Sequence, residues 1–352
     1  MIVERTLADG GQTADAVAAW LVEWLGEARR SLDIALYDVR LPGPVGDGVA
    51  GAIRAAASRG VAVRIAFNGD DSVARKPLPP PPRTEPSLLE ALGVPLRAIP
   101  GEPDLMHHKY VVRDLAAVWT GSTNWTLDSW TREENVLVTV ASEPLAHAYA
   151  RDFEDLWRHK RVEGSGAFDV APIDVDGTPV RAWFSPGRGP ELSARIAKRI
   201  LAAKRRVRIA SPVLTAAPIL AALNQALSEA RVDVAGVGDA TQIGQVFAQW
   251  RDNEHSAWKG PLLARVLHGL PWSGKVSTPY APGAVHDYMH AKVTVADDVV
   301  FIGSFNLSRS GEENAENVLE IVDAGLAERM AGFIDAVRAR YPAVAVPAYA
   351  AS

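Results

Sequence analysis

Two copies of one short motif, His-x-Lys-(x)4-Asp, are the residues of this chain best suited to chemistry. An imidazole has an unperturbed pKa of about 6.5, so it can act as a nucleophile or as a general acid and base. A lysine two residues away adds a positive charge that can stabilise an anion. Two imidazoles and two ammonium groups together suit a reaction at a phosphate. The motif residues are His107, Lys109 and Asp114 in the first copy and His290, Lys292 and Asp297 in the second.

A second pattern, Gly-Ser-x-Asn, follows the first motif after six residues and the second after five. Alternate residues of a strand share a face, so the Ser and Asn of a returning hairpin strand should lie beside the His-Lys pair. We therefore expect hydroxyl and carboxamide groups to bind phosphate oxygens. The residues concerned are Ser122, Asn124, Ser304 and Asn306. Asp114 and Asp297 fall at the predicted turns, where Asp is favoured, and we expect them to organise the site without moving protons.

A glutamate stands ten residues beyond the last residue of each Gly-Ser-x-Asn pattern. These glutamates are Glu134 and Glu316, and each precedes an Asn and an apolar strand. A carboxylate that returns to the site can hold an imidazole N–H, which fixes the tautomer and stabilises the imidazolium. We expect both glutamates to have this supporting role.

With these paired motifs the sequence resembles the phospholipase D superfamily over nearly its whole length. The resemblance implies a phosphodiesterase that needs neither metal nor cofactor and that works by hydrolysis or transfer. One histidine would form a phosphohistidine and the other would protonate the leaving group, with His107 favoured as nucleophile and His290 as acid and base. Two departures are visible: the second hairpin is one residue shorter, and Arg132 stands where the second copy has Asn314.

The elements that must position these motifs also occur twice. The pattern of helix, strand, helix and strand precedes each motif, and the copies are 183 residues apart, which indicates a duplicated domain. The fold expected is α/β: two similar α-β-α sandwich domains with mixed sheets. The resemblance adds pseudo-twofold symmetry and an active site at the domain interface. We expect the domains to be 1–163 and 164–352, and the Pro-rich stretch 77–86 to be an exposed loop.

The composition fits a globular protein. Apolar residues make up 48% and charged residues 22% of the chain. No basic stretch with an apolar run opens the sequence and no long apolar segment occurs, so we expect a cytoplasmic protein. With no cysteine there is no disulfide, thiolate metal site or catalytic thiol. A net charge of -5 disfavours nonspecific nucleic-acid binding.

Three other interpretations are weaker. Residues 46–51 match a dinucleotide fingerprint with Asp70 or Asp71 downstream, but no strand leads directly into it, so helix entry is favoured over an NAD-binding oxidoreductase. A noncatalytic phosphate-binding module would not need two complete motifs. Zinc at His107 and His108 lacks further ligands, and Lys109 would repel it. We expect His108 to be structural.

The substrate is less determined than the reaction. The resemblance allows phospholipid head groups, cardiolipin synthesis or nucleic acid; the second is disfavoured because no membrane anchor is visible. Residues 254–289 are rich in apolar groups such as Trp258 and Trp272, and a loop of this kind above the site would suit a phospholipid and a peripheral membrane contact. Packing of this segment on its own domain is equally compatible, and its basic residues would suit a nuclease. Both motifs lie in one chain, so a monomer is plausible.

Overall fold

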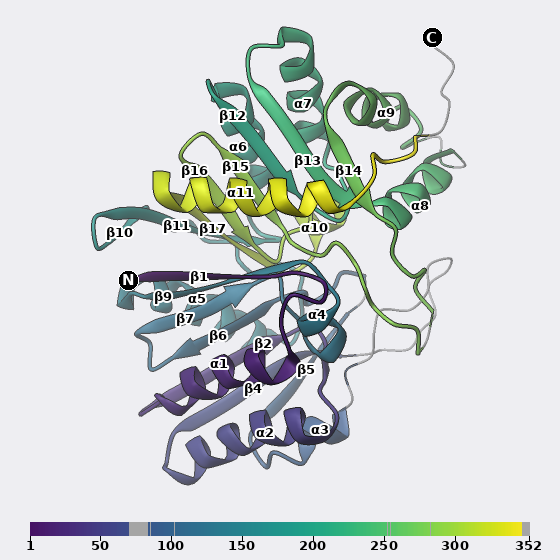
Figure 1. Cartoon of the computed structure of the whole chain (residues 1–352). Helices are drawn as coiled ribbons and strands as arrows, with labels where there is room; N and C mark the ends of the chain where they lie inside the picture. Colours follow the sequence, from purple (N-terminus) through teal and green to yellow (C-terminus); the bar gives the residue numbers. More distant parts are fainter. Residues whose placement is uncertain are drawn as a thin grey trace.

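The computed structural model describes residues 1–69, 84, 86–101, 103–251, 253, 255–281 and 283–346. It has two mixed α/β halves, each built on its own sheet (Figure 1). The predicted fold class is therefore confirmed. The predicted loop at 77–86 falls mostly outside the described residues.

The first half contains a seven-stranded sheet in the order β1-β9-β7-β6-β2-β4-β5. Its inner strand β2 pairs in parallel with β4 and antiparallel with β6. The strands are β1 (Ile2–Leu7), β2 (Ser31–Leu36), β4 (Ala62–Gly69), β5 (Leu96–Pro100), β6 (Lys109–Arg113), β7 (Ala117–Gly121) and β9 (Asn135–Ala141). A separate two-stranded ribbon joins β3 (Val39–Arg40) to β8 (Trp125–Thr126).

The second half repeats this order position by position. Its sheet runs β10-β11-β17-β16-β15-β12-β13-β14, so β11 to β14 correspond to β1 to β5 of the first sheet and β10 is an addition. The strands are β10 (Ile173–Val175), β11 (Thr178–Ser185), β12 (Arg206–Ala210), β13 (Asp233–Asp239), β14 (Trp272–Lys275), β15 (Val293–Ala296), β16 (Val299–Gly303) and β17 (Glu316–Val322). Each motif hairpin thus occupies the same place in its sheet, β6–β7 in the first half and β15–β16 in the second.

Helices cover both faces of each sheet. In the first half they are α1 (Ala14–Gly26), α2 (Gly43–Ser58), α3 (Pro86–Glu90), α4 (Leu127–Thr131) and α5 (Glu143–His159). In the second half they are α6 (Gly189–Ala202), α7 (Ala217–Glu229), α8 (Ala240–Arg251), α9 (Lys259–Gly269), α10 (Arg309–Glu313) and α11 (Ala324–Arg340). Thr13 caps the start of α1, because its Oγ1 accepts a hydrogen bond from the Ala16 N–H.

The dinucleotide fingerprint is part of helix α2, which begins at Gly43. All three fingerprint glycines therefore lie in helical turns. A Cβ at Gly46 would lie 1.7 Å from the Leu41 carbonyl oxygen, so close packing explains this glycine. The preference for helix entry over a pyrophosphate loop is confirmed.

The two halves share a hydrophobic core. This cluster includes Tyr149 and Phe153 from α5, Phe184 from β11, and Met330 and Ile334 from α11. Figure 1 shows α11 lying across the strands of the second half, next to the first half. The change from one sheet to the other falls between α5 and β10, an interval that contains the expected domain boundary. In the described part of the chain no helix is long and apolar enough to cross a membrane.

Candidate active site

Each histidine motif begins on a strand segment that pairs with the opposite half. The His107 N–H donates to the carbonyl of Ala315, just before β17, at 2.9 Å. The His290 N–H donates to the carbonyl of Glu134, just before β9, at 3.1 Å. These reciprocal pairings bring both motifs to the interface between the halves.

The four basic side chains of the motifs are buried at this interface. His107 and His290 are 6% and 9% exposed, and Lys109 and Lys292 are 2% and 4% exposed. Each lysine Nζ donates to the carbonyl oxygen of the histidine in its own motif, at 2.6 Å for Lys109. The ring centroids of Tyr37 and His107 lie 4.5 Å apart, and the Lys109 Nζ lies 4.7 Å from the centroid of the Tyr37 ring. The site therefore concentrates positive charge in a place largely closed to water.

A different acceptor faces each imidazole across the interface. His107 Nδ1 lies 2.8 Å from both carboxylate oxygens of Glu316, on β17 of the second half. His290 Nδ1 lies 3.1 Å from the Asn135 carboxamide oxygen and 3.4 Å from Glu133 Oε2. The Asn135 oxygen also accepts from the Ser122 hydroxyl at 2.6 Å. Each imidazole can thus carry its proton on Nδ1 and present a bare Nε2.

Glu134 does not have the position expected of it. Its carboxylate bonds Lys275 at 3.1 Å and Tyr341, and no imidazole among the described residues. The cause is one extra residue between α4 and β9, where three residues precede the strand, against two between α10 and β17. Counting from the motif Asn therefore selects the wrong glutamate, and Glu133 is the carboxylate near His290.

The two halves carry the same pair of groups in reversed order. Asn135 and Glu316 are the first residues of the equivalent strands β9 and β17. Two residues earlier stand Glu133 in the first half and Asn314 in the second. The Asn135 amide donates to Glu133 at 3.1 Å, and the Asn314 amide donates to Glu316 at 3.5 Å. The sequence Glu-x-Asn thus faces His290, and Asn-x-Glu faces His107, so the two imidazoles have different electrostatic surroundings.

The serines of the Gly-Ser-x-Asn patterns lie behind these acceptors. The Ser122 hydroxyl accepts from the Val136 N–H, in addition to its bond to Asn135. The Ser304 hydroxyl accepts from the Asn317 N–H and bonds Glu316. Both serines are fully buried. Their hydroxyls hold the imidazole acceptors in place and are not directed to a phosphate as expected.

The two motif asparagines have polar atoms without a partner. Asn124 and Asn306 each lie three residues beyond the second strand of their hairpin, and their buried side-chain oxygens make no hydrogen bond with any described residue. Buried polar groups are normally paired, so unpaired carboxamides at the end of the hairpins are compatible with a ligand-binding role.

The motif aspartates lie at the far ends of the hairpin strands. Asp114 is five residues from Lys109, roughly 16 Å along an extended strand. Its carboxylate accepts the backbone N–H groups of residues 29–31, and Asp297 accepts those of residues 204–206 in the same way. These bonds lower the pKa of both aspartates. The aspartates organise the entry into β2 and β12, remote from the imidazoles.

Burial shifts the protonation of the whole centre. It lowers the pKa of Lys109 to about 7, and it lowers that of Lys292 with help from the charge of Lys109. Burial and the lysines lower the pKa of both His107 and His290. Burial raises the pKa of Glu316 to about 8. A bound phosphate would favour the charged forms of the lysines, so this centre is tuned for an anion.

His108 belongs to the interface and not to the reaction centre. It is fully buried, accepts a hydrogen bond from the Asn317 amide at 3.1 Å, and lies 3.0 Å from Asp152. Asn317 in turn accepts from Thr120 and Tyr149 of the first half. Among the described residues no group of His, Asp and Glu is arranged to hold a metal ion.

The apolar segment expected above the site packs mainly on its own domain. Helix α9 and strand β14 bury Leu263, Val266 and Trp272 in the second-half core, so the loop interpretation is wrong for these residues. Trp258 is the exception, at 55% exposure. The part that reaches the first half begins with Lys275 at the end of β14 and continues after it (Figure 1), where His286 contacts Arg40 and Asp128. Sequence reasoning missed this contact, because His286 belongs to no motif.

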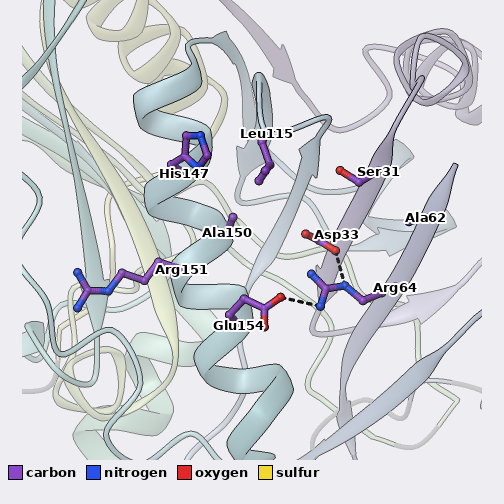
Figure 2. A pocket seen from close by; sticks show the side chains of 9 residues that line it. All are labelled: Ser31, Asp33, Ala62, Arg64, Leu115, His147, Ala150, Arg151 and Glu154. Carbon is purple, nitrogen blue, oxygen red and sulfur yellow. Dashed lines mark hydrogen bonds and ion pairs between the residues drawn. The ribbon is translucent and has the colours of Figure 1, made fainter.

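A surface hollow of about 490 Å³ lies elsewhere, near the Asp114 end of the first sheet (Figure 2). Arg64 lines this hollow, and its guanidinium already forms ion pairs with Asp33 at 2.8 Å and with Glu154 at 2.6 Å. This hollow is at the opposite end of β2 from the imidazoles. We do not count it as part of the candidate site.

Comparisons with known proteins identify the family of the chain. Residues 21–157 and 196–337 match the family described as "Cardiolipin synthase, PLD-like domain", one segment in each half. The mitochondrial cardiolipin hydrolase of Xenopus tropicalis is 32% identical over 145 residues, 41% of this chain and 62% of that protein. The human protein of that name is 30% identical over 138 residues, 39% of this chain and 49% of that protein. The chain thus spans less than two thirds of these relatives.

The fold also matches a solved enzyme over its whole length. The phosphatidylserine synthase of Haemophilus influenzae has a TM-score of 0.64 at 12% identity, over 98% of this chain and 87% of that one. At this identity the likeness concerns the fold alone.

Proposed function

The chain belongs to the phospholipase D superfamily, in the family of the cardiolipin synthase PLD-like domain, and from this premise we propose that it is a phosphodiesterase acting on phospholipid head groups. The observation that carries the proposal is the convergence of two imidazoles, each with an oxygen acceptor behind Nδ1, and two buried lysines. The names of the matched family and of the cardiolipin hydrolases favour a phospholipid over a nucleic acid.

In the first step His107 acts as the nucleophile. Its Nε2 attacks phosphorus while Glu316 accepts the Nδ1 proton in a hydrogen bond and stabilises the positive ring. The bond from phosphorus to the head-group oxygen breaks, and His290, which enters this step as the doubly protonated imidazolium, gives its Nε2 proton to that oxygen and becomes neutral. Lys109, Lys292, Asn124 and Asn306 stabilise the nonbridging oxygens. The carboxylate next to His107 supports this assignment, because His290 has a neutral carboxamide as its nearest acceptor.

In the second step the phosphohistidine is resolved. His290, now neutral, takes a proton from water or from an acceptor alcohol, whose oxygen attacks phosphorus as the bond to His107 breaks. Water gives hydrolysis and an alcohol gives transfer. We also propose that one copy of the chain suffices, with domains 1–163 and 164–352 each supplying one motif.

A substrate panel tests this function. Phosphatidylcholine, phosphatidylglycerol, single-stranded DNA and bis(4-nitrophenyl) phosphate would each be incubated with the chain, with and without EDTA. We expect turnover of at least one phospholipid and of the aryl diester, at rates that EDTA leaves unchanged. Turnover of DNA without either phospholipid would favour a nuclease, and no turnover of any diester would refute the proposal.

A further inference from the structure

His286 and Arg40 form a polar contact between the halves. The Arg40 Nη2 lies 3.2 Å from His286 Nδ1. A guanidinium can only donate, so Nδ1 accepts and the neutral ring carries its proton on Nε2. Arg40 is held from behind by Asp38, with nitrogen–oxygen distances of 3.0 and 2.9 Å. Burial and the charge of Arg40 lower the pKa of His286, in keeping with a neutral ring.

This contact lies at the edge of the phosphodiester site. We call this edge, with Arg40, His286 and Tyr288, the wall of the site. Arg40 is on β3, which pairs with β8, and β8 begins directly after Asn124. Tyr37, at the end of β2, packs on the His107 ring. From the other half, His286 precedes His290 by only four residues and is close enough to influence the pKa of His290.

Two polar atoms near this contact make no hydrogen bond with a described residue, and one of them, the Tyr288 hydroxyl, is itself buried. His286 is 6% exposed, and its side-chain hydrogen bond to Arg40 uses Nδ1, so its Nε2–H has no acceptor among the described residues. The Tyr288 hydroxyl is buried without a hydrogen bond, on a ring 5.3 Å from that of His286. Unpaired buried polar groups require an explanation, and a bound ligand group is one.

Resting on the proposed function, we propose that His286 and Tyr288 form a subsite for the leaving alcohol of the substrate and that this subsite takes an uncharged hydroxyl group. An imidazole N–H and a phenol hydroxyl are both suited to hydrogen bond a hydroxyl. His286 lies on the same segment as His290, the group proposed to protonate the leaving oxygen. The subsite is therefore on the side of the site where the alcohol departs.

The charges of the wall argue against other ligands. An ammonium head group needs a free carboxylate, but Asp38 is bound by Arg40, and Asp128 and Asp287 accept the backbone N–H groups of His286 and Thr278. A second phosphate needs a free cation, but the charge of Arg40 is balanced by Asp38. A neutral donor pair therefore selects a neutral hydroxyl.

The test compares two lipids that differ in head-group hydroxyls, phosphatidylglycerol and phosphatidylpropanol, in the same mixed micelles. The wild-type chain should show a higher kcat/KM for phosphatidylglycerol. In His286→Ala the ratio of the two values should fall about three- to tenfold, the effect of one hydrogen bond. His286→Gln keeps an N–H donor and should retain part of the ratio. His268→Ala, on the exposed surface of α9, is the matched control and should leave the ratio unchanged.

The outcomes separate this subsite from the proposed function. Release of nitrophenol from bis(4-nitrophenyl) phosphate reports the phosphodiesterase alone. If that activity is present but the lipids show no hydroxyl preference, through equal rates or no rate on either, the subsite is refuted. A ratio that His286→Ala leaves unchanged refutes it too. A preference for phosphatidylcholine that His286→Ala removes would replace it with a cation subsite.

Discussion

The Glu316 carboxylate lies 2.8 Å from Nδ1 of His107, although 209 residues separate them in the chain. The equivalent position of the first half, Asn135, puts a neutral carboxamide oxygen 3.1 Å from His290. A carboxylate stabilises an imidazolium more than a carboxamide does. The two histidines are therefore unequal, although their motifs are alike.

Replacement of Glu316 by Gln should reduce turnover by at least about 10²-fold, because a buried amide can hold the wrong tautomer of His107 and cannot balance the charge of its ring. The measurement is kcat on bis(4-nitrophenyl) phosphate, with thermal melting as a check on folding. Glu313→Gln, on the same side of the second half but partly exposed, is the control. Equal activity in the two variants would contradict the role of Glu316.

Each of Lys109→Met and Lys292→Met should lower kcat by about 10²–10³-fold, the usual loss for one preorganised donor to a reacting oxyanion. Burial disfavours the charged form of both lysines, so methionine should not lower thermal stability. Steady-state kinetics and melting curves on the same samples check this. A variant with normal kcat would show that its half contributes no charge to the reaction.

The pKa of Lys109 near 7 predicts a basic limb in the pH profile. Lysine is charged only when protonated, so raising the pH through about 7 removes a charge from the free site and kcat/KM should fall. A bound phosphodiester anion favours the cation and raises this pKa, so the fall in kcat should occur at higher pH. Profiles of kcat and kcat/KM that fall at the same pH would contradict this coupling.

Much of the fold was predictable, because the helix and strand periods of each half and the paired motifs are local patterns. The hairpins after His107 and His290 are examples. The partner of His290 was not predictable by counting. One extra residue before β9 moves Glu134 away from the imidazole, and only strand pairing reveals the shift. His286 was missed because its role depends on Arg40, 246 residues away.

Replacing the two tryptophans of the apolar segment should affect the stability of the protein to different degrees, and neither replacement should change the substrate preference. Trp272 is 3% exposed in the second-half core, so Trp272→Ala should lower the free energy of unfolding by about 3–5 kcal/mol. Trp258 is 55% exposed, so Trp258→Ala should change it by less than about 0.5 kcal/mol. Denaturant titrations measure both. A selective loss of binding to phospholipid vesicles in Trp258→Ala would instead support a membrane contact at this residue.

A trapped intermediate can test the proposed roles of His107 as nucleophile and His290 as general acid and base. In His290→Asn the general acid is missing, but an aryl diester has a leaving group that departs without a proton, so His107 should still be phosphorylated. The adduct should persist, because its hydrolysis lacks the base. Peptide mapping under conditions that preserve acid-labile phosphate should find it on His107, and His107→Asn should form none. An adduct on His290 in His107→Asn, with none in His290→Asn, would reverse the two roles and would mean that the Asn135 side, and not the Glu316 side, supports the nucleophile.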